Sequence, residues 1–430
     1  MLLLQLGYEW NGHNFLKPRS YRGILGYMET KQGALQGVKV VTCSTAQAGT
    51  VPYMLMADLG AEVIKIEVPG NGDNSRKGGE TIGDLSSYFE TNNRGVKSLT
   101  LNLKKAEGRD ILHRLVAKAD IFGQNFRPGA AERYGFGYEE LIKINPALVY
   151  ASISAYGPDG PDAKLPGVDA VGQALSGLTE AFSIPGQPMR TGVASVADET
   201  CAILTFGGIL AAYIHAKETG KGQKVETSLV GSAFRLMGWT MATAMWSNRP
   251  PITGARINGG RNSAGIAACF NDKNGKPFAI QLSHKHWKPA LDLLGFYGAL
   301  SNKGLDDLGL AYESDEKKNE ILDLLAELFS TETRDHWVGL LRGADMVAVN
   351  VNTMLEASVD PNVVDNGYVD KIYHEESDQT LTIHGSPWKF SETPSKPKFA
   401  PKLGEHNSEI LGTIGYDEGQ IERLENDEVI

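Results

Sequence analysis

The sequence predicts an α/β fold, in which a large Rossmann-like domain with a parallel sheet is joined to a smaller α+β domain. Between residues 36 and 154, short β-branched runs alternate with helical patterns. Such alternation is typical of a parallel sheet with helices on both of its faces. The chain has 430 residues, and single cores stop growing at about 250 to 300 residues. Two lobes are therefore expected.

The elements of the first lobe follow from its apolar patterns. Strands are predicted at 37–44, 61–68, 120–126 and 148–154, and helices at 50–60, 104–119, about 198–218 and about 228–247. In an open parallel sheet, ligands bind beyond the carboxyl ends of the strands. The loops at those ends contain Gln47, Gly72, Phe126 and Tyr156. We therefore expect a binding site to be built from these loops.

The amino-acid composition changes at 248–265. This stretch is rich in Pro, Gly, Arg and Asn, which predicts a loop between the lobes. Beyond it, Asn274-Gly275 between two apolar runs predicts a hairpin, followed by helices at 291–300 and 317–330 and by a helix that leads into a strand. The expected division is an N-terminal extension at 1–27, a large domain at 28–249, a small α+β domain at 250–385 and a C-terminal segment at 386–430.

Composition excludes several classes of protein. The chain is 41% hydrophobic and 22% charged, as expected of a globular protein, and its formal net charge is -10. A general nucleic-acid surface needs an excess of clustered cations, so no nucleic-acid partner is expected. The apolar run at the N-terminus is too short to span a membrane. Three cysteines in apolar surroundings cannot form a disulfide framework, and a reducing cytoplasm is the expected location.

Asp198 is the leading candidate for a catalytic nucleophile. It follows a short apolar run and opens a long apolar helical pattern that ends at Gly220. Taken alone, an Asp before a helix is more often an N-cap, whose side-chain oxygen accepts from a backbone N–H of the first turn. The surrounding sequence favours the catalytic interpretation.

That surrounding sequence is an ordered set of phrases. They include ALQGVKVVTCSTAQAG, MLMADLGAEVIKIEVPGNGD, NRGVKSLTLNLKKAEGRDIL, ADIFGQNFRPGAAERYGFGYEEL, INPALVYASISAYGPDGP, the segment around Asp198, and SPWKFSETP with APKLGEHNSEIL near the end. Together they resemble the class III coenzyme A transferases, the family of formyl-CoA and carnitine CoA-transferases that also contains alpha-methylacyl-CoA racemases. The resemblance is dense over about 35–235 and looser over 385–415.

The resemblance implies a fold, an assembly and a reaction. The C-terminal segment would return to the large domain, and each chain would form a ring interlinked with a second ring in a homodimer; a heteromer with a related subunit is an alternative. Asp198 matches the aspartate that forms an anhydride and then a CoA thioester. Gln47 matches the residue whose amide faces the reacting carbonyl, and its alternative role is to cap the next helix. Asp169 matches an acidic position near the nucleophile, and its alternative role is to cap the helix that it begins.

Coenzyme A would be a substrate rather than a permanently bound cofactor, and the reaction needs no metal. The acyl-CoA donor could be succinyl-CoA, and the acceptor a carboxylic acid. For the binding of CoA, the resemblance carries over Ala48, Leu101, Lys104, Asn125, Phe126, Ala130 and Arg133. Lys104 and Arg133 would contact phosphates, and the apolar members would contact adenine and pantetheine. Val68 stands where formyl-CoA transferases have an arginine, so one phosphate contact is expected to be lost or supplied from elsewhere. The Gly-rich loop of those enzymes is also not reproduced, since INGGRNSAG keeps only Gly259 and Gly260, and formate and oxalate are therefore not the expected substrates.

Two alternatives remain at this point. A racemase would need a histidine directly before the residue that matches Asp169, but that neighbour is Val168, and no histidine occurs between His113 and His215. A non-catalytic nucleotide-binding module would use VIKIEVPGNGDNS as a dinucleotide loop. That stretch lacks the third glycine of G-x-G-x-x-G and is not followed by a helical pattern. Both alternatives are therefore weaker than the transferase.

Overall fold

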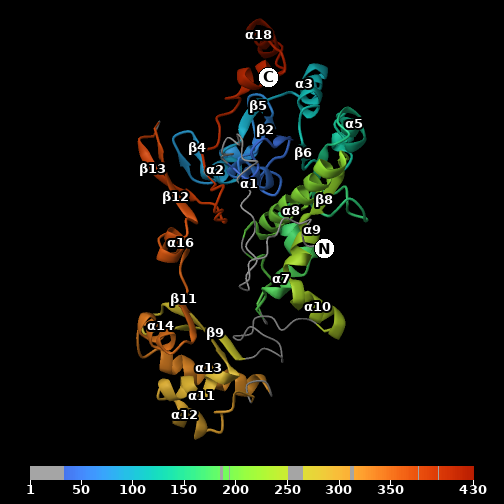
Figure 1. The fold of residues 1–430 in the computed structure, drawn as a ribbon. Coiled ribbons are helices and arrows are strands. Elements are labelled where there is room, and N and C mark those ends of the chain that lie inside the picture. Colours follow the sequence, from blue (N-terminus) through green and yellow to red (C-terminus); the bar gives the residue numbers. More distant parts are fainter. Residues whose placement is uncertain are drawn as a thin grey trace, which may run out of the picture.

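The computed structural model describes residues 33–184, 187–192, 194–249, 265–309, 314–375, 377–395 and 397–430. The predicted extension at 1–27 and nearly all of the predicted loop at 248–265 lie outside these residues. Two lobes are visible (Figure 1), a large one around β1 to β8 and a small one around α11 to α14.

A six-stranded sheet organises the large lobe. Its strands are β1 (Lys39–Thr42), β2 (Glu62–Glu67), β5 (Lys97–Thr100), β6 (Ile121–Gln124), β7 (Val149–Ser154) and β8 (Lys224–Ser228). All neighbouring strands pair in parallel, in the order β5-β2-β1-β6-β7-β8. This is the doubly wound order, in which the direction of winding reverses between β1 and β6. The predicted Rossmann-like α/β fold is confirmed.

Helices cover both faces of this sheet. On one face, α1 (Val51–Asp58) and α8 (Val196–Thr219) pack on the strands through residues such as Met56 and Ile209, both fully buried. On the other face, α3 (Ala106–Val116) and α5 (Tyr138–Ile144) pack around Phe122 and Tyr150. Because each strand alternates its side chains between the faces, both cores draw on the same apolar runs.

The two edge strands, β5 and β8, were not predicted as strands. Both are short and mostly polar, with sequences KSLT and KVETS that contain one apolar residue each. A central strand is buried on both faces, so its sequence is a continuous apolar run. The edge strands β5 and β8 lack such a run, and the apolar pattern therefore does not reveal them. Sequence patterns alone therefore found the four central strands and missed the edges.

Helix α8 is long and apolar enough to cross a membrane by length and composition. In the structure it contacts α1, α6 (Asp169–Leu175), α9 (Leu229–Leu236), β7 and β8. Residues along one of its faces, including Ala197, Cys201, Thr205 and Ile209, are fully buried against these elements. Packing within the large lobe accounts for this face, whereas Ile203, Leu204 and Ile214 on the rest of the helix are 41% to 58% exposed.

The small lobe is built on an antiparallel sheet of β9 (Gly265–Asn271), β10 (Pro277–Ser283) and β11 (Val347–Asn350). The predicted hairpin at Asn274-Gly275 joins β9 to β10, with Gly275 at φ +75° as the turn requires. The chief helices are α11 (His284–Leu293), α12 (Tyr297–Ser301), α13 (Asp315–Phe329) and α14 (Arg334–Gly343), and they enclose a core around Phe278 and Phe329. The prediction of a smaller α+β unit is confirmed.

A connecting segment leads back from the small lobe to the large one (Figure 1). It contains α15 (Met354–Ser358), α16 (Pro361–Asp365) and the hairpin of β12 (Val369–His374) and β13 (Gln379–His384). The chain then crosses to β5 and ends in α17 (Asn407–Thr413) and α18 (Glu418–Asn426). The backbone N–H groups at the exposed edge of β5 donate to side chains of this tail: Ser98 to His406 Nδ1 at 3.3 Å and Thr100 to Asn407 Oδ1 at 2.9 Å. The tail thereby protects one edge of the sheet.

The cysteines are free, and they differ in environment. Cys43 and Cys201 are buried, as expected of thiols that pack as small hydrophobes, but Cys269 in β9 is exposed. The expectation of apolar surroundings is wrong for Cys269, because alternate side chains of a strand that is packed on one face point to solvent.

Candidate active site

The loops that follow β1 and β6 meet at the point where the strand order reverses. The side chain of Asn125, just after β6, accepts from the Thr45 N–H at 3.0 Å and donates to the Thr45 carbonyl at 2.8 Å. This pair of bonds fastens the two loops together. Gln47 and Phe126, which lie next to them in the chain, are therefore held at the crevice where open α/β sheets bind ligands.

Asp198 lies in the first turn of α8, but it is not the N-cap. Helix α8 begins at Val196 and its N-cap is Ser195, which has a left-handed backbone with φ of 65°. The capping interpretation of Asp198 is therefore wrong, because the helix begins two residues earlier than the apolar pattern indicated. The carboxyl group of Asp198 is half-buried, and its position near a helix N-terminus favours its anionic form.

Asp169 holds the backbone of the turn that carries Asp198. It is the first residue of α6 (Asp169–Leu175), and its Oδ1 accepts from the N–H groups of Ala197 at 2.8 Å and Asp198 at 3.1 Å. Its Oδ2 accepts from Gln173 Nε2 at 2.5 Å. Asp169 thus satisfies N–H groups at the start of α8 rather than at the start of its own helix. Asp169 was expected to cap α6, the helix that it begins. It does cap a helix, but that helix is α8.

The candidate nucleophile, Asp198, has two other carboxylates near it, and burial together with their charges raises its pKa. Burial, followed by the negative charges of Asp169 and Glu199, raises the pKa of Asp198 to about 6. Burial, followed by the charges of Asp198 and Asp73, also raises the pKa of Tyr88. At neutral pH Asp198 is therefore ionised and only partly stabilised, as a nucleophile requires.

Gln47 is joined to the same turn. Its Nε2 donates to Glu199 Oε2 at 2.8 Å, so the amide nitrogen is directed toward the start of α8. The next helix, α1, has Thr50 as its N-cap and no capping bond from a side chain, so the alternative role of Gln47 as a side-chain cap is wrong. An amide nitrogen carries two hydrogens, and one of them remains for a substrate oxygen.

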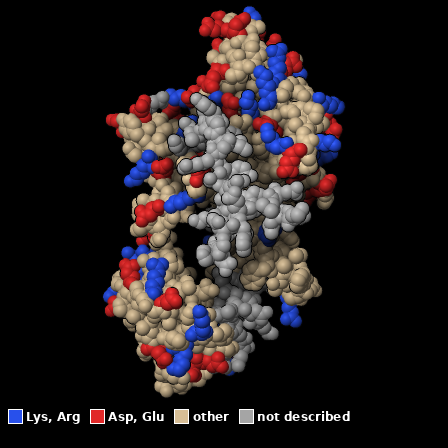
Figure 2. Space-filling view, viewed as in Figure 1, with Lys and Arg blue, Asp and Glu red and all other residues tan. Residues whose placement is uncertain are grey.

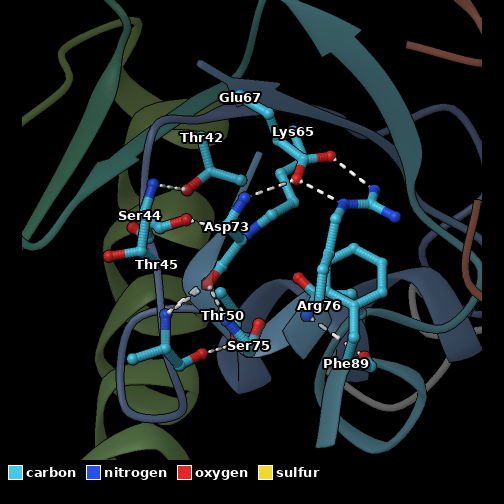
Figure 3. A network of polar contacts seen from close by, with 12 residues as sticks. Thr42, Ser44, Thr45, Thr50, Lys65, Glu67, Asp73, Ser75, Arg76 and Phe89 are labelled. Atoms are coloured by element: carbon cyan, nitrogen blue, oxygen red, sulfur yellow. Dashed lines mark hydrogen bonds and ion pairs between the residues drawn. The ribbon is translucent and has the colours of Figure 1, made fainter. Parts of the chain in front are cut away.

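A buried polar network supports the Gln47 loop, and it was not predicted from the sequence (Figure 3). Lys65 Nζ forms an ion pair with Asp73 Oδ2 at 2.8 Å and donates to the Ser44 carbonyl at 2.9 Å. The Asp73 carboxylate also accepts from the N–H of Ala46 at 3.2 Å. Ala46 has a left-handed backbone, with φ of 60°. Charge-assisted bonds from Asp73 thus hold the residue before Gln47 in a conformation that L-residues rarely adopt.

The other half of the network is a second ion pair. Glu67 receives two bonds from Arg76, at 2.7 and 2.8 Å, and one from the Ser98 hydroxyl at 2.6 Å. The guanidinium of Arg76 lies 3.7 Å from the centre of the Phe89 ring. Alternate charges in a strand, as in IKIE, usually indicate a face in contact with solvent. Lys65 and Glu67 are nearly fully buried, so their pairing could be recognised only in three dimensions.

A cavity of about 600 Å³ opens beside this network. Its walls come from the carboxyl ends of β1, β2 and β5, from the aromatic residues Phe126, Tyr134 and Phe136, and from the C-terminal residues Glu425, Glu428 and Ile430. Such a volume suits a large ligand. Of the seven residues expected to bind CoA, the cavity is lined by Leu101, Lys104 and Phe126. Val68, which is 60% exposed, also lines it.

The other four expected CoA contacts lie elsewhere. Ala48 and Ala130 are buried, Asn125 is engaged with Thr45, and Arg133 is exposed on the short helix α4 (Ala130–Arg133). Asn125 and Phe126 line a neighbouring cavity of about 490 Å³, together with Val168 and Gly167. Phe126 therefore borders both cavities, and the second cavity lies beside Asp169.

Charge on the visible face is mixed (Figure 2), with Lys and Arg side chains interspersed among Asp and Glu over both lobes. That distribution agrees with the net charge of -10. Within the ranges that the structure describes, no group of three or more His, Cys, Asp or Glu is arranged to hold a metal ion.

Comparison with known proteins identifies the family. The model of CoA-transferase family III matches residues 35–407. An acetyl-CoA:oxalate CoA-transferase of Acetobacter aceti is 32% identical over 88% of this chain and 95% of its own length. The human succinyl-CoA:glutarate CoA-transferase is 29% identical over 91% of this chain and 88% of its own. A CAIB/BAIF family protein from Brucella suis has a similar structure, with a TM-score of 0.78 and 27% identity over 89% of this chain and 100% of its own.

This chain therefore belongs to CoA-transferase family III. It is an enzyme of that class, which transfers coenzyme A to a carboxylic acid. The resemblance found in the sequence is confirmed, and a non-catalytic nucleotide-binding module is no longer an alternative.

Proposed function

We propose that the chain moves coenzyme A from an acyl-CoA donor to a small carboxylic acid through covalent intermediates on Asp198. The observation that carries this proposal is the half-buried carboxyl group of Asp198, whose pKa is raised to about 6 among neighbouring carboxylates. Such a group is ionised at neutral pH and reactive as a nucleophile. A serine or cysteine could accept an acyl group, but neither could become the acyl part of a CoA thioester.

The reaction proceeds in two matched halves. The Asp198 carboxylate attacks the donor thioester carbonyl, and the C–S bond breaks to give a mixed anhydride and the CoA thiolate. The thiolate then attacks the Asp198 carbonyl, which releases the donor acid and leaves an aspartyl-CoA thioester. The acceptor carboxylate attacks that thioester to form a second anhydride, and the thiolate attacks its acyl carbonyl. The products are a new acyl-CoA and free Asp198.

Two neighbouring side chains assist these steps. Each attack creates an oxyanion, and in this proposal the second N–H of the Gln47 amide donates to it; the bond from Gln47 to Glu199 in the first turn of α8 supports this role. One preorganised donor of this kind contributes about 2.7 to 4 kcal/mol in other acyl-transfer enzymes. Asp169 acts through its bonds to the N–H groups of Ala197 and Asp198. It fixes the backbone of the nucleophile and raises the pKa of the Asp198 carboxyl.

The cavity of about 600 Å³ is the proposed site for the body of the CoA molecule, with Lys104 as a phosphate partner. Succinyl-CoA is the first donor to test, because a succinyl-CoA:glutarate CoA-transferase is among the relatives. Oxalate belongs in the acceptor panel for the corresponding reason, and its use would contradict the expectation drawn from Val68. The interlinked homodimer, the heteromeric alternative and the cytoplasmic location remain predictions.

Covalent trapping tests the proposal directly. Enzyme mixed with acyl-CoA is quenched with hydroxylamine, which converts an aspartyl anhydride or thioester to a hydroxamate, and peptides are analysed by mass spectrometry. We expect the modification at Asp198, and no turnover by Asp198→Ala, which should still bind CoA. Glu199→Gln serves as the matched control and should retain the adduct at Asp198. Substantial turnover by Asp198→Ala, or an adduct at another residue, would overturn the assignment.

A further inference from the structure

Glu199 brings a further carboxylate to the candidate nucleophile. It follows Asp198 in the first turn of α8, and its Oε2 accepts from Gln47 Nε2 at 2.8 Å. After burial and the charge of Asp169, the charge of Glu199 is a further cause of the raised pKa of Asp198. Glu199 thus contacts the amide that faces the reacting carbonyl and acts electrostatically on the group that attacks it.

The charge of Glu199 is less well compensated than that of Asp169. Within the described part of the chain, the Asp169 carboxylate receives three hydrogen bonds, two of them from the backbone N–H groups of Ala197 and Asp198. The side chain of Glu199 receives one, from Gln47. Among the described residues, no Lys, Arg or His forms an ion pair with either carboxylate. The negative charge of Glu199 is therefore free to act on a group that enters the site.

The Gln47 amide sets the distance between Glu199 and the reacting carbonyl. One hydrogen of its Nε2 is donated to Glu199, and in the proposed reaction the other is donated to the oxyanion. The two N–H bonds of an amide group diverge by about 120°, and each acceptor lies about 2.9 Å from the nitrogen. The oxyanion and the nearer oxygen of Glu199 are consequently about 5 Å apart. A group attached to the reacting carbon lies at a comparable distance, because two bonds separate it from the oxyanion.

A charge at this distance discriminates among acids. Two negative unit charges about 5 Å apart repel each other, and at an effective dielectric constant of about 20 this repulsion corresponds to about 10²-fold in a rate or equilibrium constant. Glu199 is half-buried, so water and salt screen part of the repulsion, and about 10- to 100-fold is expected. The carboxyl group that reacts is common to all acids, and its repulsion cancels when two acids are compared. A second charge on the acid does not cancel.

Resting on the proposed function, we propose that Glu199 makes the site selective for acids that have a single carboxylate. A second carboxylate next to the reacting one, as in oxalate or malonate, meets the charge of Glu199 and is rejected. The extended chain of a longer diacid such as glutarate carries its second charge several ångströms further away, so the penalty decreases with chain length. The same order applies to donor acyl groups, because they occupy the same place in the first half of the reaction.

Pairs of acids with matched shapes measure this selectivity. We compare kcat/KM for oxalate with pyruvate, for malonate with acetoacetate and for glutarate with 5-oxohexanoate, since a methyl ketone has the shape of a carboxylate without its charge. Glu199→Gln keeps an oxygen that accepts from Gln47 and removes the charge. It should raise the ratio of diacid to keto acid about 10- to 100-fold for the first two pairs and less than about threefold for the third. Where turnover is too slow to measure, inhibition constants of the same acids against the best acceptor give the ratio.

Glu218→Gln is the matched control. It removes an exposed carboxylate from the other end of α8, about 28 Å along the helix from Glu199. None of the three ratios should change. Glu199→Ala separates the two effects of the side chain: it also removes the charge and should raise the first two ratios, but it lowers kcat for every acid because Gln47 loses its partner.

Several outcomes overturn the specificity role. Ratios that stay unchanged in both Glu199 variants would show that this residue acts only as the partner of Gln47. Equal gains for the three pairs would show that shape, rather than charge, decides. A hydroxylamine adduct at Asp198 together with unchanged ratios would overturn this inference alone. A missing adduct in the wild-type enzyme would overturn the proposed reaction, and the inference with it.

Discussion

Two clusters of carboxylates in the large lobe differ in how their charge is balanced. In the first, Glu67 and Asp73 are buried, and each forms an ion pair, with Arg76 and with Lys65. In the second, Asp169, Asp198 and Glu199 surround the first turn of α8, and within the described ranges none forms an ion pair with a cation. The pKa values differ accordingly: those of Glu67 and Asp73 are lowered despite burial, because of their cationic partners, and that of Asp198 is raised.

The contrast separates a structural role from a chemical one. Charges that are paired and hydrogen-bonded hold a loop in place and lose their reactivity. A carboxylate that lacks a cation keeps its basicity, at the expense of stability. The first cluster holds Ala46 in place and so positions Gln47, while the second carries the nucleophile.

The largest expected effect breaks the paired cluster. Lys65→Met leaves Asp73 buried without its cation, and we expect a loss of about 3 to 5 kcal/mol in the free energy of unfolding, measured by chemical denaturation. Lys303→Met, which removes the exposed Lys303–Glu320 pair, is the control and should lose less than about 1 kcal/mol. Equal losses of unfolding free energy in the two variants would show that the buried Lys65–Asp73 pair stabilises the fold no more than an exposed pair does.

The next largest effect is expected at Gln47, which follows the loop held by Asp73 and donates a hydrogen bond to Glu199. Gln47→Ala should lower kcat by about 10²- to 10³-fold, since one oxyanion donor is removed, with little change in KM. Glu199→Ala removes the partner of Gln47 but keeps the amide, and a smaller loss is expected. An unchanged kcat in Gln47→Ala would remove this residue from the oxyanion role.

Asp198→Asn should stabilise the folded protein at pH 7, whereas Lys65→Met should destabilise it. The folded pKa of Asp198 is raised to about 6, so folding disfavours its ionised form, and the wild-type protein loses stability as pH rises from about 4 to about 6. At pH 7 the neutral variant should therefore melt a few degrees higher (~2–4 °C), although it is inactive. At pH 4 the difference should vanish. A lower melting temperature at pH 7 would contradict the assignment of unbalanced charge.

The smallest effect is a shift in pH dependence. Wild-type kcat/KM should fall as pH drops through about 6, because Asp198 becomes protonated. Asp169→Asn keeps an oxygen to accept from the N–H groups of Ala197 and Asp198 but removes a negative charge. The acidic limb of the profile should consequently move to lower pH. An unmoved limb would show that Asp169 acts only through its hydrogen bonds.

Local patterns in the sequence were sufficient for the central strands, for the helices α1, α3 and α8, and for the hairpin at Asn274-Gly275. Each of these depends on residues that are near one another in the chain, so its propensity is visible without the fold. The helix predicted at about 228–247 is divided into α9 (Leu229–Leu236) and α10 (Gly238–Ser247), and the one predicted at 291–300 spans the end of α11 and most of α12. The nucleophile candidate was also found from the sequence, through the motif around Asp198, although the geometry of its turn was not. The start of α8 was misjudged because its N-cap, Ser195, has a left-handed backbone that the apolar pattern does not reveal.

By itself, the sequence determined the α/β class, the family and the candidate nucleophile, because repeated apolar runs and an ordered set of motifs are properties of the chain in one dimension. Only the tertiary structure decided that Asp169 caps α8, that Lys65 is buried against Asp73, and that residues 425–430 complete the large cavity. These three facts pair residues through space. Their physical reason is that burial and charge neutralisation depend on which distant groups the folded sheet brings within a few ångströms of each other.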